Sequence, residues 1–130
     1  MILCWNARGC ASEGFSAICS NLRQTYHPQI VILLETWVSG LKAEHIIRKL
    51  GFQFHIRQDA EGFSGGIWIC WSDLNIQITS IEQHKQIIHC CVCMSGFRGY
   101  LSAVYGSPNS TSRKVLWEII KNIGHNMQGN

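Results

Sequence analysis

The sequence is short of charge and of long apolar runs, and each shortage excludes a class of protein. Charged residues make up 15% of the 130 residues against 46% hydrophobic residues, which excludes an intrinsically disordered chain. The apolar runs stay below the roughly 18 residues that a membrane helix needs, and Asn6 and Arg8 come too early for the core of a signal peptide. We therefore expect one soluble globular domain over residues 1–130, without a membrane partner.

Cysteine and charge set further bounds on the compartment and the partner. Seven cysteines are an odd number without secretory context, so we expect reduced thiols and an intracellular location, nuclear or cytoplasmic. The net charge of +3 is compatible with a polyanionic partner. After Glu82 the only acidic residue is Glu118, whereas five basic residues follow: Lys85, Arg98, Arg113, Lys114 and Lys121. This last third of the chain faces either phosphates or solvent.

Three segments carry apolar residues at the spacing of amphipathic helices. They cover about residues 12–27, 41–50 and 116–124. We expect Ser12 and Ser39 to cap the first two at their N-termini, and Gly51 and Gly124 to end the second and the third.

Strand-like runs occupy much of the remaining chain. Ile2–Trp5 and Ile30–Leu34 lie on either side of the first helix, and Tyr100–Val104 precedes the last one. Between them, residues 67–71, 76–78 and 87–94 alternate or are continuously apolar, and a turn is expected at Gly65-Gly66. The N-terminal part of the chain alternates strands with helices, and several paired strands follow it. This order indicates an α/β sandwich.

Polar side chains follow three of these runs. Asn6 follows the first strand, Glu35 closes Ile30–Leu34, and Tyr105 follows Tyr100–Val104. Because an unpaired carboxylate costs several kcal/mol to bury, we expect Glu35 to face a cation, a donor cluster or a cleft. Sites in layered α/β folds gather where strand ends converge, so these ends are the predicted site and Glu35 is a candidate metal ligand.

Four motifs, in order, carry a resemblance to a known family. They are Trp5-Asn6-Ala7-Arg8-Gly9, Leu34-Glu35-Thr36, Ser64-Gly65-Gly66-Ile67 and Val104-Tyr105-Gly106-Ser107-Pro108-Asn109. Together they resemble the endonuclease/exonuclease/phosphatase superfamily, which is DNase I-like. Within this superfamily, the tryptophan-rich sequence is most similar to the endonuclease domain of plant non-LTR retrotransposon polyproteins. These polyproteins also carry a reverse transcriptase.

The resemblance implies a four-layered α/β sandwich that cleaves phosphodiesters of DNA with Mg²⁺ or Mn²⁺. It would make Glu35 the metal-binding glutamate, Asn6 an asparagine near the metal and the scissile phosphate, and Tyr105 a tyrosine that bonds a phosphate oxygen. These residue types suit the chemistry. Mg²⁺ takes hard oxygen ligands and usually only one or two carboxylates from a protein.

The sequence departs from the family in its later motifs. The family's Gly-Asp-Phe-Asn and Ser-Asp-His types of motif, which supply the catalytic base and an aspartate-histidine pair, do not occur in the 130 residues, and His125 does not match them. The sequence therefore predicts the N-terminal portion of one domain, an incomplete sandwich with little or no nuclease activity. Uncovered apolar sheet surface would favour self-association.

Other interpretations of the same residues stay open. Glu35 could pair with Arg8, Asn6 could satisfy a turn, and Tyr105 could be an ordinary strand aromatic. The scaffold could then be a noncatalytic module that binds nucleic acid or protein.

A zinc site and a stacking surface are weaker alternatives. His89, Cys91 and Cys93 share one strand face, but their spacing is not that of known zinc modules, so core packing is favoured. The five tryptophans could stack bases, yet packing explains them better.

Overall fold

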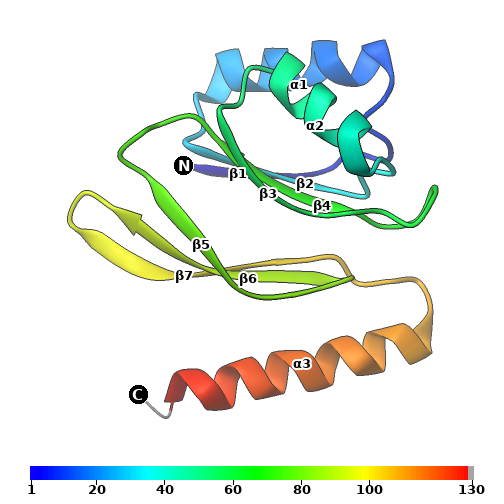
Figure 1. Ribbon diagram of the computed structural model, residues 1–130, viewed down its shortest axis with the longest axis vertical. Helices are drawn as coiled ribbons and strands as arrows, with labels where there is room; N and C mark the ends of the chain where they lie inside the picture. Colours follow the sequence, from blue (N-terminus) through cyan, green and yellow to red (C-terminus); the bar gives the residue numbers. More distant parts are fainter. Residues whose placement is uncertain (129–130) are drawn as a thin grey trace.

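Four layers make up the molecule, in the order helices, sheet, sheet, helix (Figure 1). The computed structural model describes residues 1–128. The first sheet has the strand order β1-β2-β4-β3, formed by β1 (Ile2–Asn6), β2 (Ile30–Leu34), β4 (Ile67–Trp71) and β3 (Phe54–Gln58). Its outer face carries α1 (Glu13–Tyr26) and α2 (Gly40–Lys49). The second sheet comprises β5 (Gln77–His84), β6 (Ile87–Met94) and β7 (Phe97–Val104), and α3 (Ser110–Gln128) covers its outer face.

This arrangement confirms the predicted α/β fold of mixed sheets flanked by helices. β1 runs parallel to β2, whereas every other strand pair is antiparallel. β2 and β4 are buried on both faces, as their continuous apolar sequences predict. Val31 and Leu33 pack beneath the helices, and Ile30 and Ile32 pack between the sheets.

The helix ends follow the sequence in part. The Ser12 hydroxyl accepts a hydrogen bond from the Phe15 N–H at 3.1 Å, so the predicted cap of α1 is confirmed. Ser39 occupies the N-cap position of α2 as predicted, but its side chain makes no capping hydrogen bond. The carboxylate of Asp59, the residue after β3, accepts the Gly40 N–H at 3.2 Å instead. The prediction that Gly124 ends the last helix is wrong, because α3 continues to Gln128. A helical glycine costs about 1 kcal/mol, which a packed helix tolerates.

Two further features differ from the predicted pattern. The strand β3 was not predicted, although its apolar residues Phe54 and Ile56 alternate with the polar residues His55 and Arg57. The turn between β3 and β4 lies at Glu61–Ser64, whose backbone groups bond each other in both directions. Gly65-Gly66, expected to form that turn, instead lead from it into β4.

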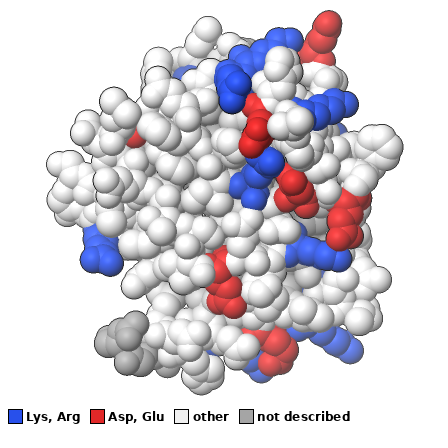
Figure 2. Space-filling model, viewed as in Figure 1, with Lys and Arg blue, Asp and Glu red and all other residues white. Residues whose placement is uncertain are grey.

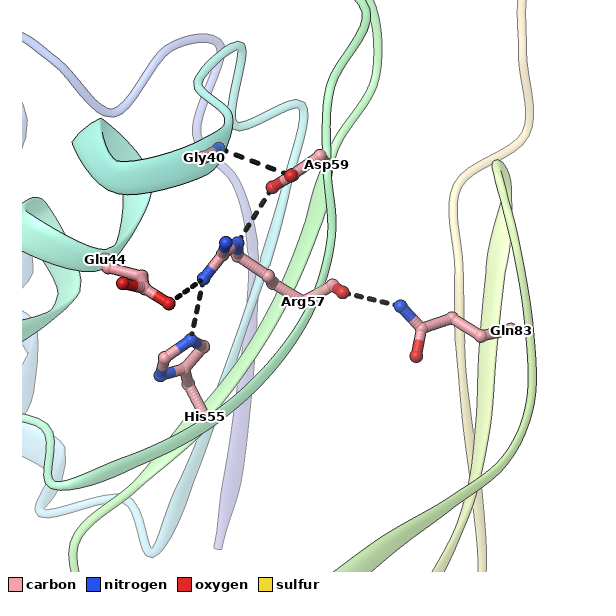
Figure 3. Close-up of polar contacts among 6 residues, drawn as sticks. All are labelled: Gly40, Glu44, His55, Arg57, Asp59 and Gln83. Carbon is pink, nitrogen blue, oxygen red and sulfur yellow. Dashed lines mark hydrogen bonds and ion pairs between the residues drawn. The ribbon is translucent and has the colours of Figure 1, made fainter.

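Arg57 on β3 connects three layers (Figure 3). Its guanidinium donates to Asp59 at 2.8 Å and to Glu44 of α2 at 3.2 Å, and its carbonyl accepts from Gln83 of β5. The guanidinium also lies 3.1 Å from the His55 ring. Burial, together with the neighbouring Arg57 charge, lowers the pKa of His55, so this ring stays neutral beside the cation.

β1 and β7 leave open edges at the sandwich's incompletely covered side. Leu3 and Trp5 pack under the helices, so Ile2 and Cys4 point toward the second sheet, yet Ile2 is 49% exposed. On β7, Phe97 is 58% exposed. The second sheet lies under β3 and β4 and does not extend beneath β1 far enough to bury it. Unpaired edges with apolar side chains are consistent with self-association, which stays a prediction.

The cysteines and the helices bear on the expected compartment and class, which stay predictions. All seven cysteines are free thiols, and burial raises the pKa of Cys10 to about 12. Among the described helices, none has a stretch that is both long and apolar enough to cross a membrane.

Candidate functional site

Glu35 and Tyr105, which are 70 residues apart in sequence, are in direct contact across the two sheets. The Tyr105 hydroxyl donates a hydrogen bond to Glu35 Oε1 at 2.6 Å. Glu35 follows β2 of the first sheet, and Tyr105 follows β7 of the second. Burial and this bond to Glu35 raise the pKa of Tyr105 to about 12, so the phenol keeps its proton and remains a donor at neutral pH.

Asn6 lies at the same end of the first sheet as Glu35. It pairs in parallel register with Leu34, the residue before Glu35. By strand alternation its side chain points toward the face that carries the second sheet, and it is exposed. The structure thus gathers the predicted site residues at one end of the sandwich, with Glu35 and Tyr105 in contact and Asn6 on the adjacent strand.

The backbone around Glu35 is held in an unusual conformation. Arg8, Glu35 and Trp37 have φ values of +48°, +54° and +58°, in the left-handed region that non-glycine residues rarely adopt. Two backbone hydrogen bonds fix the segments together: Gly9 N–H donates to the Glu35 carbonyl at 2.8 Å, and Cys10 N–H donates to the Thr36 carbonyl at 3.0 Å. Such strain costs on the order of 1–3 kcal/mol per residue and concentrates at functional sites.

The loop between β3 and β4 closes over the segment that follows Glu35. The Thr36 side chain is fully buried, and its hydroxyl is without a hydrogen-bond partner among the described residues. Gly66 lies directly against this hydroxyl, because a Cβ built on Gly66 would come within 2.0 Å of Thr36 Oγ1. The Trp37 N–H donates to the Gly65 carbonyl at 3.2 Å. The glycine pair therefore holds the Glu35 segment in place by close backbone approach.

A small open cleft of about 160 Å³ lies beside Tyr105. The β3–β4 loop lines it with Asp59 and Glu61, and the turn between β5 and β6 lines it with Lys85 and Gln86. Lys85 and Glu61 pair at 2.8 Å, but both are about 70% exposed (74% and 69%), so the pair contributes little stability.

An aromatic pair connects the tip of the β3–β4 loop with the segment that follows Glu35. Phe63, at the tip of the β3–β4 loop, is 87% exposed, and its ring meets Trp37 edge-on at 6.4 Å between centroids. The sequence did not identify Phe63 as a site residue, because a single phenylalanine in a glycine-rich turn carries no pattern. The sequence analysis also did not single out Asp59, which directly follows β3. Its two carboxylate oxygens accept hydrogen bonds from Arg57 and from the Gly40 N–H.

The donor set fits one half of a Mg²⁺ site. Glu35 could offer its Oε2 to a cation, because its Oε1 accepts the Tyr105 hydrogen bond, and the exposed Asn6 could offer an amide oxygen. Within residues 1–128, groups of three or more acidic, histidine or cysteine ligands suitable for a metal are absent. A hard cation that keeps most of its waters suits this sparse oxygen set better than zinc does.

The alternative zinc ligands are placed elsewhere and engaged in packing. His89 is buried, its Nδ1 lies 2.7 Å from the Ser102 hydroxyl, and its ring stacks on Tyr100 at 5.6 Å. Cys91 and Cys93 are half-buried on the same strand face. The tryptophans also pack for the most part: Trp5 stacks on Phe15 and Trp71 on Phe54, although Trp117 on α3 is 57% exposed.

The basic residues of the last third are partly neutralised. Lys85 pairs with Glu61, Lys121 lies 3.8 Å from Glu118, and Arg113 donates to the Ser107 and Pro108 carbonyls. On the face drawn in Figure 2, basic and acidic side chains are interleaved along one side, beside a broad uncharged area. This distribution favours a solvated surface over a continuous phosphate-binding stripe.

Comparison with known proteins places the fold. Neither a protein-family model nor a curated protein matches the chain. Among solved structures, the chain is similar to the endonuclease domain of TRAS1, a telomere-specific non-LTR retrotransposon, with a TM-score of 0.69 and 17% identity over 97% of this chain and 52% of that one. It is also similar to the AP endonuclease LMAP from Leishmania major, with a TM-score of 0.61 and 11% identity over 82% of this chain and 40% of that one.

The chain thus spans about half the length of the first of these structures and less of the second. Identities this low establish a shared fold. The two neighbours are endonucleases, and their architecture is the one that the four sequence motifs predicted. The chain therefore shares the α/β fold of these endonuclease structures.

Proposed function

We propose that this chain is the N-terminal portion of a Mg²⁺-dependent DNA endonuclease domain of retrotransposon type. The observation that carries the proposal is the 2.6 Å hydrogen bond between Tyr105 and Glu35. The motifs of the resemblance point to these two residues, and the fold brings them together from separate sheets. The location of such a protein, nuclear or cytoplasmic, stays a prediction.

In this proposal the chain's own residues bind and orient a phosphodiester. Glu35 and the amide oxygen of Asn6 would hold Mg²⁺ or Mn²⁺, which when bound neutralises negative charge on a phosphate and its leaving oxygen. Tyr105 fixes the Glu35 carboxylate through one oxygen and keeps its proton at neutral pH. The exposed Phe63 beside Trp37 offers an apolar surface on which a base or sugar could rest.

The test of this function is cation-dependent DNA binding. We expect fluorescence anisotropy to show weak binding of a short DNA duplex that strengthens with millimolar Mg²⁺, because a cation held by Glu35 would offset the negative charge of a phosphate. Glu35→Gln keeps the shape of the side chain and removes its charge. It should abolish the Mg²⁺ response, about a tenfold change in Kd, while leaving the binding without Mg²⁺ in place.

A matched control is Glu118→Gln, an exposed carboxylate on α3 at the far side of the second sheet. It should leave the Mg²⁺ response intact. The competing function is a noncatalytic module that binds nucleic acid or protein on the same scaffold. DNA binding with normal salt dependence that neither Mg²⁺ nor Glu35→Gln alters would favour that module and overturn the proposed function.

A further inference from the structure

Gln86 lies in the two-residue turn between β5 and β6 and makes three hydrogen bonds, two to the segment that carries Tyr105 and one to α3. Its carbonyl accepts the Tyr105 N–H at 2.8 Å, and its side-chain Oε1 accepts the Ser107 N–H at 2.9 Å. Its side-chain Nε2 donates to the Ser112 carbonyl in the first turn of α3 at 2.8 Å. One half-buried residue thus joins the second sheet, the segment after β7, and α3.

The other side of the same segment is held by α3 itself. Arg113 Nη1 donates to the Ser107 and Pro108 carbonyls at 2.9 and 2.8 Å. Asn109 Oδ1 accepts the Ser112 N–H at 3.0 Å, as an N-cap residue does. Gln86 therefore provides the side-chain connection from the sheet, and Arg113 provides the connection from the helix.

We propose that Gln86 is a positioning residue that sets where the Tyr105 hydroxyl meets Glu35. Ser107 is two residues from Tyr105, so a shift of the segment between β7 and α3 moves the Tyr105 Cα, from which the side chain extends. The bond from Tyr105 to Glu35 is 2.6 Å long, and hydrogen bonds weaken steeply as distance and angle depart from the optimum. The inference rests on the proposed role of the Glu35–Tyr105 pair.

The test is an NMR measurement at neutral pH on protein carrying ¹³C-labelled tyrosine. The chain has three tyrosines, Tyr26, Tyr100 and Tyr105, so Tyr105→Phe assigns the ring signal that matters. Glu35→Gln replaces the carboxylate by a weaker acceptor, so it gives the ¹³Cζ chemical shift of Tyr105 when its hydroxyl makes a weaker hydrogen bond. We expect Gln86→Met, which keeps the length of the side chain without its amide, to move the Tyr105 signal toward that position.

Amide exchange and a matched variant separate positioning from general stability. In Gln86→Met the Ser107 amide should exchange about tenfold faster, as expected for the loss of one hydrogen bond. Gln83→Met removes a comparable amide that bonds Arg57 and Ser80, and it should leave the Tyr105 signal where it is in the parent protein. Gln86→Glu keeps the acceptor for Ser107 and should retain the parent signal, which also covers the case in which Gln86→Met fails to fold.

The outcomes distinguish the two proposals. An unchanged Tyr105 signal in Gln86→Met, with a shifted one in Glu35→Gln, overturns the positioning role and leaves the Glu35–Tyr105 pair intact. Equal shifts in Gln86→Met and Gln83→Met also overturn it, because they would reflect loosening of the sheet. An unshifted Tyr105 signal in Glu35→Gln would show that the Tyr105–Glu35 hydrogen bond is not formed in solution. That result would overturn both the positioning role of Gln86 and the proposed function.

Discussion

Gly66→Ala should lower the free energy of unfolding by at least about 3 kcal/mol, the largest effect we expect from a single methyl group in this chain. Gly66 has a φ of +98°, and the new Cβ would lie 2.0 Å from Thr36 Oγ1 and 3.1 Å from the Ala60 Cβ. Thr36 is fully buried, so it can yield only if the segment behind Glu35 moves. Urea denaturation of the parent and the variant measures the change.

Gly62→Ala is the matched control for this prediction. Gly62 lies in the same loop and has a φ of +61°, but a Cβ there would have no atom within 4 Å. It should cost only the backbone strain, on the order of 1 kcal/mol. Similar losses from the two substitutions would show that close approach to Thr36 is not what the loop requires. The Gly66 variant should also weaken the Tyr105 bond, since Thr36 is adjacent to Glu35.

The second large expected effect concerns catalysis, which we expect to be absent. We expect the 130-residue polypeptide with Mg²⁺ to nick supercoiled plasmid no faster than its own Glu35→Gln variant. Among the described residues, the hydrogen bond of the Glu35 side chain comes from Tyr105, and Asp59, which lines the cleft beside Tyr105, is engaged by Arg57 and Gly40. A general base and a charge-stabilising group each contribute about 10² to 10⁴-fold, so lacking both lowers the rate by about 10⁴-fold or more.

A gel assay of plasmid topology over hours measures this rate. The control is a complete nuclease under the same conditions, which verifies the plasmid and the buffer. Mg²⁺-dependent nicking by the parent that Glu35→Gln removes would contradict the prediction, and it would show that these 130 residues hold a working active site.

Much of the site could be predicted because its signals are local. A buried apolar run predicts β2, and Glu35 at its end is conspicuous because a charge is costly there. Tyr105 is identified in the same way, as the residue after β7. The contact between them depends on how two sheets stack across 70 residues of sequence, which no periodicity reports. The expected convergence of strand ends and the family motifs both placed Glu35 and Tyr105 at one site, but the motifs assigned Tyr105 to a phosphate oxygen, and neither predicted its direct hydrogen bond to Glu35.

Other parts of the structure left a weak pattern or none. β3 is only five residues long and half-buried throughout, so the alternation of Phe54 and Ile56 with His55 and Arg57 is a short signal that was missed. Gln86 is a polar residue in a short turn, where a solvent-exposed side chain would be the ordinary expectation. Gly124 resembles a helix stop, but the apolar face of α3, with Leu116 and Ile123 packed against Ile87, holds the helix along the sheet. For Gln86 and for the end of α3, tertiary packing decided the outcome, and local sequence did not.

The most direct test of the central claim, a divalent-cation half-site at these strand ends, is a titration of ¹⁵N-labelled protein with Mn²⁺. Its unpaired electrons broaden the NMR signals of nearby nuclei. We expect the signals of Asn6, Glu35 and Tyr105 to broaden first, Mg²⁺ to restore them in competition, and Glu35→Gln to remove the effect. Broadening centred on other carboxylates, or equal broadening in Glu35→Gln, would contradict the claim.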